Sequence, residues 1–294
     1  MKLPYLILDV FTRTPLQGNG LAVVPKADGL LDGEMQAIAR EFNLSETVFL
    51  CKPQNERNTA SVRIFTPYEE LPFAGHPTVG AAVVLGLQGK ASALRIEEKV
   101  GLVTALFERV DRRTGDARFA LPRLPERIAD LSDHAGIAKA LGLSRDDIGC
   151  GTFQPSVFSA GLTFHLVPVR DAEALRRIKL DRSEWNTVFH HDHHSAYVFT
   201  LTPDEVGVDL AARMFGMGLG EDPGTGSAAA ALIGLLAEHE QGDGQFDRML
   251  RQGVEMGRPC QISLQFRKQN GQINHGAIGG QAVVLAEGVL DLGQ

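Results

Sequence analysis

The 294-residue sequence is poor in cysteine, and this limits the chemistry that it can carry. Its three cysteines, Cys51, Cys150 and Cys260, are odd in number, and no two of them form a Cys-x-x-Cys pair. A disulfide framework or a zinc ribbon needs more cysteines at closer spacing. We therefore expect neither feature, and we expect a protein of a reducing compartment, the cytoplasm.

An excess of positive charge and long hydrophobic runs are also missing. The formal net charge is −7, which gives no electrostatic support for nucleic-acid binding. No segment approaches the roughly 18 apolar residues that cross a bilayer. The first residues turn quickly to Asp9 and lack a secretory apolar region. We therefore expect no nucleic-acid and no membrane partner.

A loop-and-helix pattern, in contrast, occurs twice. The first copy reads Glu-Leu-Pro-Phe-Ala-Gly-His-Pro at residues 70–77, and the second reads Glu-Asp-Pro-Gly-Thr-Gly-Ser-Ala at residues 221–228, 151 positions later. Each is followed by small apolar residues with no polar face, which predicts a buried helix. A glycine loop before a helix offers backbone N–H groups and the positive end of the helix dipole. Two such loops facing each other would form an anion-binding site.

The repeat extends towards the N-terminus of each copy. Ser-x-x-Val-Phe and Arg-x-Phe begin at Ser45 and Arg63, and again 150 positions later at Ser195 and Arg213. The second loop has thus gained one residue. Such a long period indicates duplication of a whole domain rather than a solenoid. We therefore expect two halves related by a pseudo-twofold axis, although Val-Phe and Arg-x-Phe are also common in unrelated strands.

Short strand patterns alternate with helical ones, which predicts an α+β fold in which each half surrounds one central helix. The expected central helices contain residues 80–85 and 228–232. Prolines enclose a linker at residues 122–125, which divides the chain into halves 1–121 and 126–294. We also expect Asp32 to cap a helix, and a closing hairpin between residues 272–276 and 281–287.

Glu46 is the first candidate for catalysis. It stands directly before an apolar strand, and its counterpart in the second half is Ala196. One carboxylate on a duplicated scaffold suggests a single acid/base group rather than a matched pair. A carboxyl group beside an apolar run in a cleft tends to a raised pKa, which suits proton transfer near neutral pH. The alternative is a solvated glutamate at the start of a strand.

The tips of the two loops carry the other candidates. His76 follows Gly75 at a helix start, where the positive helix end favours the neutral imidazole; it could also serve as a cap. Asp222 could cap its helix, bind a substrate amine or pair with His76. The loop residues Gly75, Gly226 and Ser227 offer N–H groups and one hydroxyl to a carboxylate or an enolate-like oxygen.

A histidine-rich run extends from His190 to His194 and raises the question of a metal site, since imidazole is a common ligand. No separate set of acidic or cysteine ligands accompanies it. We therefore interpret the run as a surface loop and expect no metal.

Several motifs, in this order, resemble the PhzF (phenazine-biosynthesis-like) family over nearly the whole chain. They are Asp-Val-Phe-Thr at 9–12, Gly-Asn-Gly-Leu-Ala-Val-Val at 18–24, Asn-Leu-Ser-Glu-Thr at 43–47, Arg-Ile-Phe-Thr-Pro at 63–67, the two glycine loops, and Gln-Gly-Val-Glu-Met-Gly-Arg-Pro at 252–259. Gly20 stands where the family often has proline, which bears on substrate preference rather than on the fold.

The resemblance implies the diaminopimelate-epimerase fold: two similar halves, each a strongly curved sheet around a central helix, with the site in the cleft and the final strand returning to the first half. It implies an isomerase without cofactor or metal that forms a homodimer and acts on a small carboxylic acid. By the same resemblance, Glu46 corresponds to the proton shuttle, and His76 and Asp222 to its polar partners. The substrate-carboxylate contacts correspond to Ser45, Gly75, Gly226 and Ser227.

The best-known member of the family isomerises trans-2,3-dihydro-3-hydroxyanthranilate by moving a proton within a cyclohexadiene acid, and we expect the same reaction class. Relatives that racemise amino acids carry a thiol at each glycine loop, where this chain has His76 and Ser227. An epimerase or racemase with a different acid/base pair remains an alternative. A non-catalytic binder of small carboxylates is another.

Overall fold

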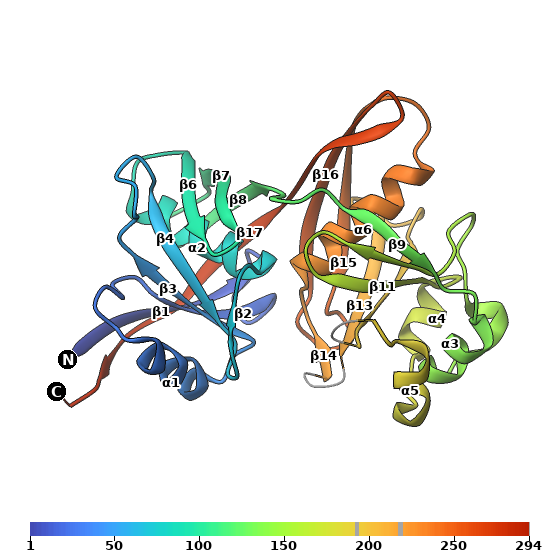
Figure 1. The fold of residues 1–294 in the computed structure, drawn as a ribbon, viewed down its shortest axis with the longest axis horizontal. Coiled ribbons are helices and arrows are strands. Elements are labelled where there is room, and N and C mark those ends of the chain that lie inside the picture. Colours follow the sequence, from blue (N-terminus) through green and yellow to red (C-terminus); the bar gives the residue numbers. More distant parts are fainter. Residues whose placement is uncertain (192–193, 217–219, 294) are drawn as a thin grey trace. The chain divides into compact units, whose positions relative to one another are not determined.

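The computed structural model of the chain describes residues 1–191, 194–216 and 220–293. They form two units, the first made of Met1–Pro122 and the segment from Gly279 onward, the second of Arg123–Ile278. The chain therefore passes between the units twice, after Pro122 and within the long last strand, β17 (Gln272–Asp291) (Figure 1). Among the described residues, no helix combines the length and the apolar character that a membrane span requires.

The strands of the first unit close into a barrel. Around the ring, each strand pairs with the next in the order β17–β1–β2–β3–β4–β6–β7–β8, and β8 pairs with β17 again. A short strand, β5 (Glu70–Leu71), adds to β4. The bounds of the ring strands are β1 (Lys2–Val10), β2 (Asn19–Val24), β3 (Glu46–Cys51), β4 (Ala60–Phe65), β6 (Ala93–Glu98), β7 (Gly101–Arg109) and β8 (Thr114–Ala120).

The predicted central helix of this unit is α2 (Gly75–Gln88), and its small residues let the barrel close around it. The helix contacts β1, β2, β3, β6, β7 and β8, so strands surround it (Figure 1). Side chains between Val79 and Val84 are buried. A Cβ atom at Gly86 would stand 2.2 Å from the ring of Phe107. The absence of a polar face in the sequence therefore reflects burial on every side.

The second helix of this unit, α1 (Asp32–Phe42), packs on the outside of the barrel. Its buried residues Met35 and Ile38 belong to one apolar cluster with Phe49 of β3. The prediction that Asp32 caps this helix is wrong, because Asp32 is its first residue. Leu31 holds the cap position, and its N–H donates to Glu34 Oε2 at 2.8 Å.

The second unit repeats this plan around α6 (Gly226–His239). Its strands pair in the order β9–β10–β11–β12–β13–β15–β16. The central helix contacts β9, β10, β11 and β16, and a Cβ atom at Gly234 would stand 2.7 Å from the Phe158 ring. The strand bounds are β9 (Glu126–Asp130), β10 (Ser156–Ser159), β11 (Thr163–Pro168), β12 (Ala196–Leu201), β13 (Leu210–Gly216), β14 (Gly220–Asp222), β15 (Gly244–Gln252) and β16 (Cys260–Gln269).

Three further helices and a 3₁₀ turn cover the outside of the second unit. A core cluster that includes Trp185 and Phe215 joins them to the strands. The indole N–H of Trp185 donates to the backbone oxygen of His194 at 2.6 Å. The bounds are α3 (His134–Leu141), η1 (Arg145–Asp147), α4 (Ala172–Arg177) and α5 (Arg182–Val188).

The internal repeat is present in the side chains as well as in the elements. Arg63 on β4 donates two hydrogen bonds to Glu70, both of 2.7 Å, and Arg213 on β13 donates two to Glu221, both of 2.8 Å. Each guanidinium also lies over the aromatic ring two residues further along its strand. The central helices α2 and α6 have the same length, 14 residues. Such shared detail supports duplication of a whole domain.

The strand ladders refine the correspondence between the halves. Phe65 pairs with Thr47, whereas its repeat partner Phe215 pairs with Ala196. The residue that matches Glu46 in register is therefore Ser195, not the Ala196 that sequence spacing indicates. Ser195 is buried and carries no charge. The second half thus has a hydroxyl where the first has a carboxyl group.

The predicted closing hairpin is wrong. Residues 272–291 form the single strand β17, which pairs with β1 from Ala282 to Asp291. The turn falls earlier, at Asn270 and Gly271, whose φ angles are 54° and 74°. Asn-Gly supplies two adjacent positive φ angles at low cost, which is what a two-residue turn between strands requires.

Candidate active site

Glu46 is the first residue of β3, and strand pairing fixes its backbone. It pairs in parallel with Leu21 of β2, next to Gly20 and Asn19. The side chain is 16% exposed, so the carboxyl group is largely shielded from water. Ser45 precedes it and is half-buried.

Glu46 and His76 lie in contact within the first unit. Glu46 Oε2 is 3.2 Å from His76 Nδ1, and the imidazole is only 5% exposed. Burial lowers the pKa of His76 to about 3, and a hydrogen bond with the Gly20 backbone opposes that shift only in part. At neutral pH the imidazole is therefore neutral. The contact therefore joins a neutral imidazole and a carboxyl group and is not an ion pair.

The first turn of α2 presents backbone donors beside this pair. Gly75 and His76 are the first two helical residues, and Ala74 at the cap position has no side-chain acceptor for their N–H groups. Pro77 follows and contributes no N–H. This end of α2 can therefore accept an anion, in keeping with the role predicted for Gly75.

The N-terminus of α6 presents a related arrangement in the second unit. Thr225 holds the cap position, but its side chain does not cap the helix. Its hydroxyl donates instead to Asp222 Oδ2 and accepts from Gln252 Nε2 at 3.0 Å. The same amide donates to the Asp222 backbone oxygen at 2.8 Å. Asp222 is thus held by side chain and backbone, and the N–H groups of Gly226 and Ser227 begin the helix.

The structure therefore groups the predicted site residues into two sets. Glu46 and His76 meet in the first unit, with Ser45 and Gly75 next to them in the chain. The second unit groups Asp222, Gly226 and Ser227 at the start of α6.

Two residues that fix the set in the second unit were not recognised as site residues from the sequence. Thr225 could have been found, because a threonine directly before a helical glycine stretch is a cap signal. Gln252 could not have been found in this way. It lies at the end of β15, and only the pairing of the strands brings it to the loop before α6. Its Oε1 accepts from Thr225 N–H at 3.1 Å and from the Tyr197 hydroxyl at 2.9 Å.

The described part of the histidine-rich run packs against another histidine, His165. His191 N–H donates to Nε2 of the buried His165, at 3.3 Å, and His165 Nδ1 lies 2.6 Å from the Ser195 oxygen. Burial lowers the pKa of His165 to about 4. No group of three potential metal ligands occurs in the described part of the chain. Asp192 and His193 lie outside the described residues.

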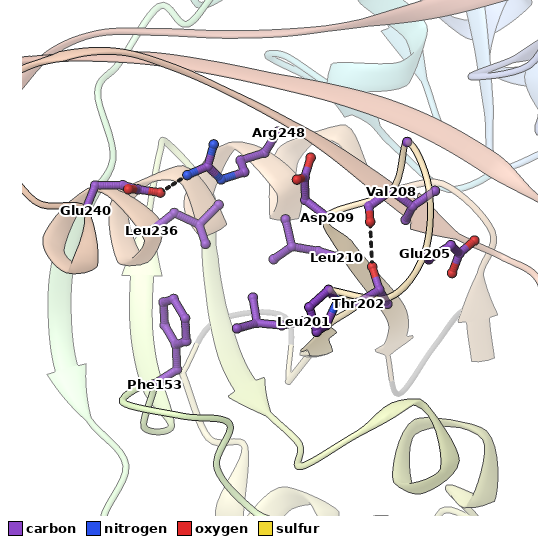
Figure 2. A pocket seen from close by; sticks show the side chains of 12 residues that line it. Phe153, Leu201, Thr202, Glu205, Val208, Asp209, Leu210, Leu236, Glu240 and Arg248 are labelled. Atoms are coloured by element: carbon purple, nitrogen blue, oxygen red, sulfur yellow. Dashed lines mark hydrogen bonds and ion pairs between the residues drawn. The ribbon is translucent and has the colours of Figure 1, made fainter.

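A separate pocket of about 550 Å³ opens in the second unit (Figure 2). Figure 2 shows Phe153, Leu201 and Leu236 on one side and the Glu240–Arg248 ion pair above them. The Thr202 hydroxyl donates to the Val208 oxygen at its rim. None of the predicted site residues is among its lining residues. This pocket is therefore distinct from the candidate site.

Solved structures with the same architecture show that the fold is diaminopimelate-epimerase-like, and relatives that are named isomerases show that the protein is an isomerase. The family model described as phenazine biosynthesis-like protein matches residues 8–288. The chain belongs to this PhzC-PhzF family.

Individual relatives cover almost the full chain. An uncharacterised isomerase of Mesorhizobium japonicum is 41% identical, over 97% of this chain and 98% of its own. A trans-2,3-dihydro-3-hydroxyanthranilate isomerase of Pseudomonas fluorescens is 36% identical, and the match covers 98% of this chain and 99% of that relative. The crystal structure of a PhzF-family protein of Bacillus anthracis, 24% identical, superposes with a TM-score of 0.87 and covers 99% of this chain and all of that one.

Proposed function

We propose that the protein moves a proton within a small unsaturated carboxylic acid, without a cofactor, and that Glu46 alone carries the proton. The observation on which the proposal rests is the shielded contact between Glu46 and the neutral His76. The second half offers Ser195 at the matching register position. The P. fluorescens relative, which is named for its action on trans-2,3-dihydro-3-hydroxyanthranilate, supports a substrate of that kind.

In this proposal, Glu46 removes a proton from a saturated carbon of the substrate. The electron pair of the broken C–H bond enters the conjugated system, and Glu46 returns the proton to another carbon of that system. No atom is gained or lost, so the reaction needs no co-reactant. Because one carboxyl group does both transfers, the proton leaves and returns on the same face. Neutral His76 lies against the Glu46 carboxyl group and limits the positions that this group can take.

The remaining residues bind the substrate in the same proposal. Its carboxylate contacts Ser45 and the N–H groups of Gly75, Gly226 and Ser227. Asp222, held by Thr225, binds a polar group of the substrate. Homodimeric assembly, which the family resemblance implies, and a cytoplasmic location, which the few cysteines suggest, complete the proposal.

Deuterium transfer in D₂O tests the reaction. We expect the wild-type protein to convert trans-2,3-dihydro-3-hydroxyanthranilate into an isomer with a shifted double bond that contains solvent deuterium. Mass spectrometry and NMR of the product report both changes. Deuterium at a stereocentre without a shifted double bond would indicate an epimerase. Binding without exchange, for this acid and for a panel of small unsaturated acids, would indicate a non-catalytic binder and refute the proposal.

Thiol alkylation separates this mechanism from a thiol-based epimerase. Cys150 and Cys260 are buried, and burial together with the Asp28 carboxylate raises the pKa of the Cys51 thiol. We expect iodoacetamide to modify Cys51 slowly and to leave the exchange rate within twofold of the untreated protein. A catalytic thiol must be reachable by a small acid and hence by the reagent. Loss of exchange in proportion to alkylation, counted by mass spectrometry, would contradict the single-carboxylate mechanism.

A further inference from the structure

A second carboxyl group, Glu98, is buried in the first unit and has no role in the reaction above. It is the last residue of β6 and is 8% exposed. Its Oε2 atom has no hydrogen-bond partner among the described residues. A buried carboxyl group with one unsatisfied oxygen is costly if charged, which raises the question of what it does there.

The pairing of the strands identifies its counterpart in the second unit. Ser61 pairs with Glu97 between β4 and β6, and Ala211 pairs with Arg251 between β13 and β15. Ser61 and Ala211 are themselves 150 positions apart, as the repeat requires. The next residue along each strand, Glu98 or Gln252, therefore occupies the same place in its half. Both residues end their strands.

Gln252 fixes the loop that precedes α6. Its amide donates to the Asp222 oxygen and the Thr225 hydroxyl, and accepts from the Thr225 N–H. An amide suits this position because it is neutral and has both a donor and an acceptor end. Gln252 thereby holds the cap residue of α6.

Thr78 connects Glu98 to the loop that precedes α2, the counterpart of the loop before α6. The Thr78 hydroxyl oxygen lies 2.8 Å from Glu98 Oε1 and 2.8 Å from the backbone oxygen of the cap residue Ala74. A hydroxyl has one hydrogen, and a backbone oxygen can only accept. Thr78 is placed to donate to either oxygen, and a threonine within a helix commonly donates to the backbone oxygen four residues before it, here that of Ala74. When it does so, its contact with Glu98 is a hydrogen bond only if Glu98 donates to Thr78. That arrangement requires a proton on Glu98.

We propose that Glu98 is a positioning residue that works as a neutral carboxylic acid, taking the part that the Gln252 amide plays in the other half. Through Thr78 it holds Ala74, and so sets the place of Gly75 and His76 at the start of α2. It does not touch the substrate. The consequence for activity rests on the proposed function, whereas the protonation and stability of Glu98 can be measured independently of it.

The electrostatic surroundings agree with a neutral group. Burial raises the pKa of Glu98 to about 8 and outweighs the opposing effect of the hydrogen bond that Thr78 could donate to the ionised form. The charged groups on neighbouring elements are engaged elsewhere: Lys99 and Arg63 pair with Glu70, and Glu97 accepts from Asn58. On α2, His76 is neutral.

The raised pKa has a definite effect on stability. Between about pH 4.5 and pH 8, the unfolded chain loses the Glu98 proton while the folded protein keeps it. Folding then takes up a proton, so stability falls as the pH rises through this window. The variant Glu98→Gln keeps a donor and an acceptor but cannot titrate. It should unfold near the wild-type temperature at pH 5 and several degrees above it at pH 9.

Carbon-13 NMR of protein labelled at the glutamate carboxyl carbons provides the direct test and needs no variant. We expect one carboxyl carbon to titrate near pH 8, and Glu98→Gln to remove that signal. If every glutamate carbon titrates near its ordinary value, or if the melting temperatures of wild type and Glu98→Gln keep a constant difference from pH 5 to pH 9, the proposal is overturned.

Kinetics then tests the positioning role. Glu98→Leu should lower kcat for deuterium exchange on the order of tenfold or more, with KM little changed, because the first turn of α2 is no longer held. Glu98→Gln should restore kcat at pH 6.5 and should abolish a decline of wild-type kcat above pH 8. If Glu98→Gln is as impaired as Glu98→Leu, the positioning role is wrong. If the wild-type protein shows no exchange, the proposed function fails, and the NMR and melting experiments still decide the state of Glu98.

Discussion

Replacing Glu46 with glutamine should lower the rate of proton exchange on the order of 10²- to 10⁴-fold while substrate affinity changes little. The amide has nearly the shape of the carboxyl group and can keep the same contact with the neutral His76, so the local structure should persist. It cannot take a proton from carbon, because an amide is too weak a base. Deuterium uptake measures the rate, and calorimetric titration with the substrate acid measures the affinity.

A matched control separates this effect from a general loss of charge. Glu69 belongs to the same unit and is exposed, so Glu69→Gln removes the same charge from the surface. We expect Glu69→Gln to exchange at the wild-type rate. Full exchange in Glu46→Gln would remove Glu46 from the reaction, and an equal loss in both variants would point to long-range electrostatics instead.

Gly253→Ala should have the largest effect on stability. Gly253 has a φ of +78°, and a Cβ atom there would lie 2.4 Å from the Arg258 oxygen and 2.5 Å from the Pro223 oxygen. Both neighbours are backbone atoms, which cannot rotate away as a side chain can. We expect a loss of about 3 kcal/mol or more in the free energy of unfolding. Because Pro223 directly follows Asp222, the exchange rate should fall as well.

Gly257 provides the control for this substitution. Its φ is +68°, but a Cβ atom there would meet nothing within 4 Å. Gly257→Ala should therefore lower the free energy of unfolding only by the strain of placing alanine at a positive φ, about 1–2 kcal/mol. Urea denaturation of both variants measures the difference. Equal losses would show that the positive φ, and not the contact with Pro223 and Arg258, sets the requirement for glycine at position 253.

The parts of the fold that could be predicted are those with strong local signals. The central helices were visible because residues 80–85 and 228–232 have no polar face, which burial inside the strands explains. β15 was missed because adjacent charged residues (Asp247-Arg248) and adjacent apolar residues (Met249-Leu250) break the alternation typical of a strand, and most of it is exposed or half-buried. β17 was divided in two because Gly279-Gly280 resembles a break, yet pairing with β1 keeps the strand continuous beyond it.

The site shows the same division between local and distant information. Glu46 and His76 lie 30 positions apart, and motif resemblance grouped them before their contact was visible. Glu98 and Gln252 could not be matched from the sequence, because their equivalence depends on which strands pair and in which register. The same holds for Ser195. The register of the strand pairs, and not the spacing in the sequence, makes it the equivalent of Glu46 in the second half.

The pairing of β1 with β17 sets an order for folding during synthesis. Lys2 pairs with Asp291, so β1 must wait for a strand that is made 289 positions later before its barrel can close. The second unit, Arg123–Ile278, is contiguous and is complete before then. It should therefore fold first, although its residues are translated later. Until β17 has been made, β1 and β8 remain unpaired sheet edges, which exposes the nascent chain to aggregation.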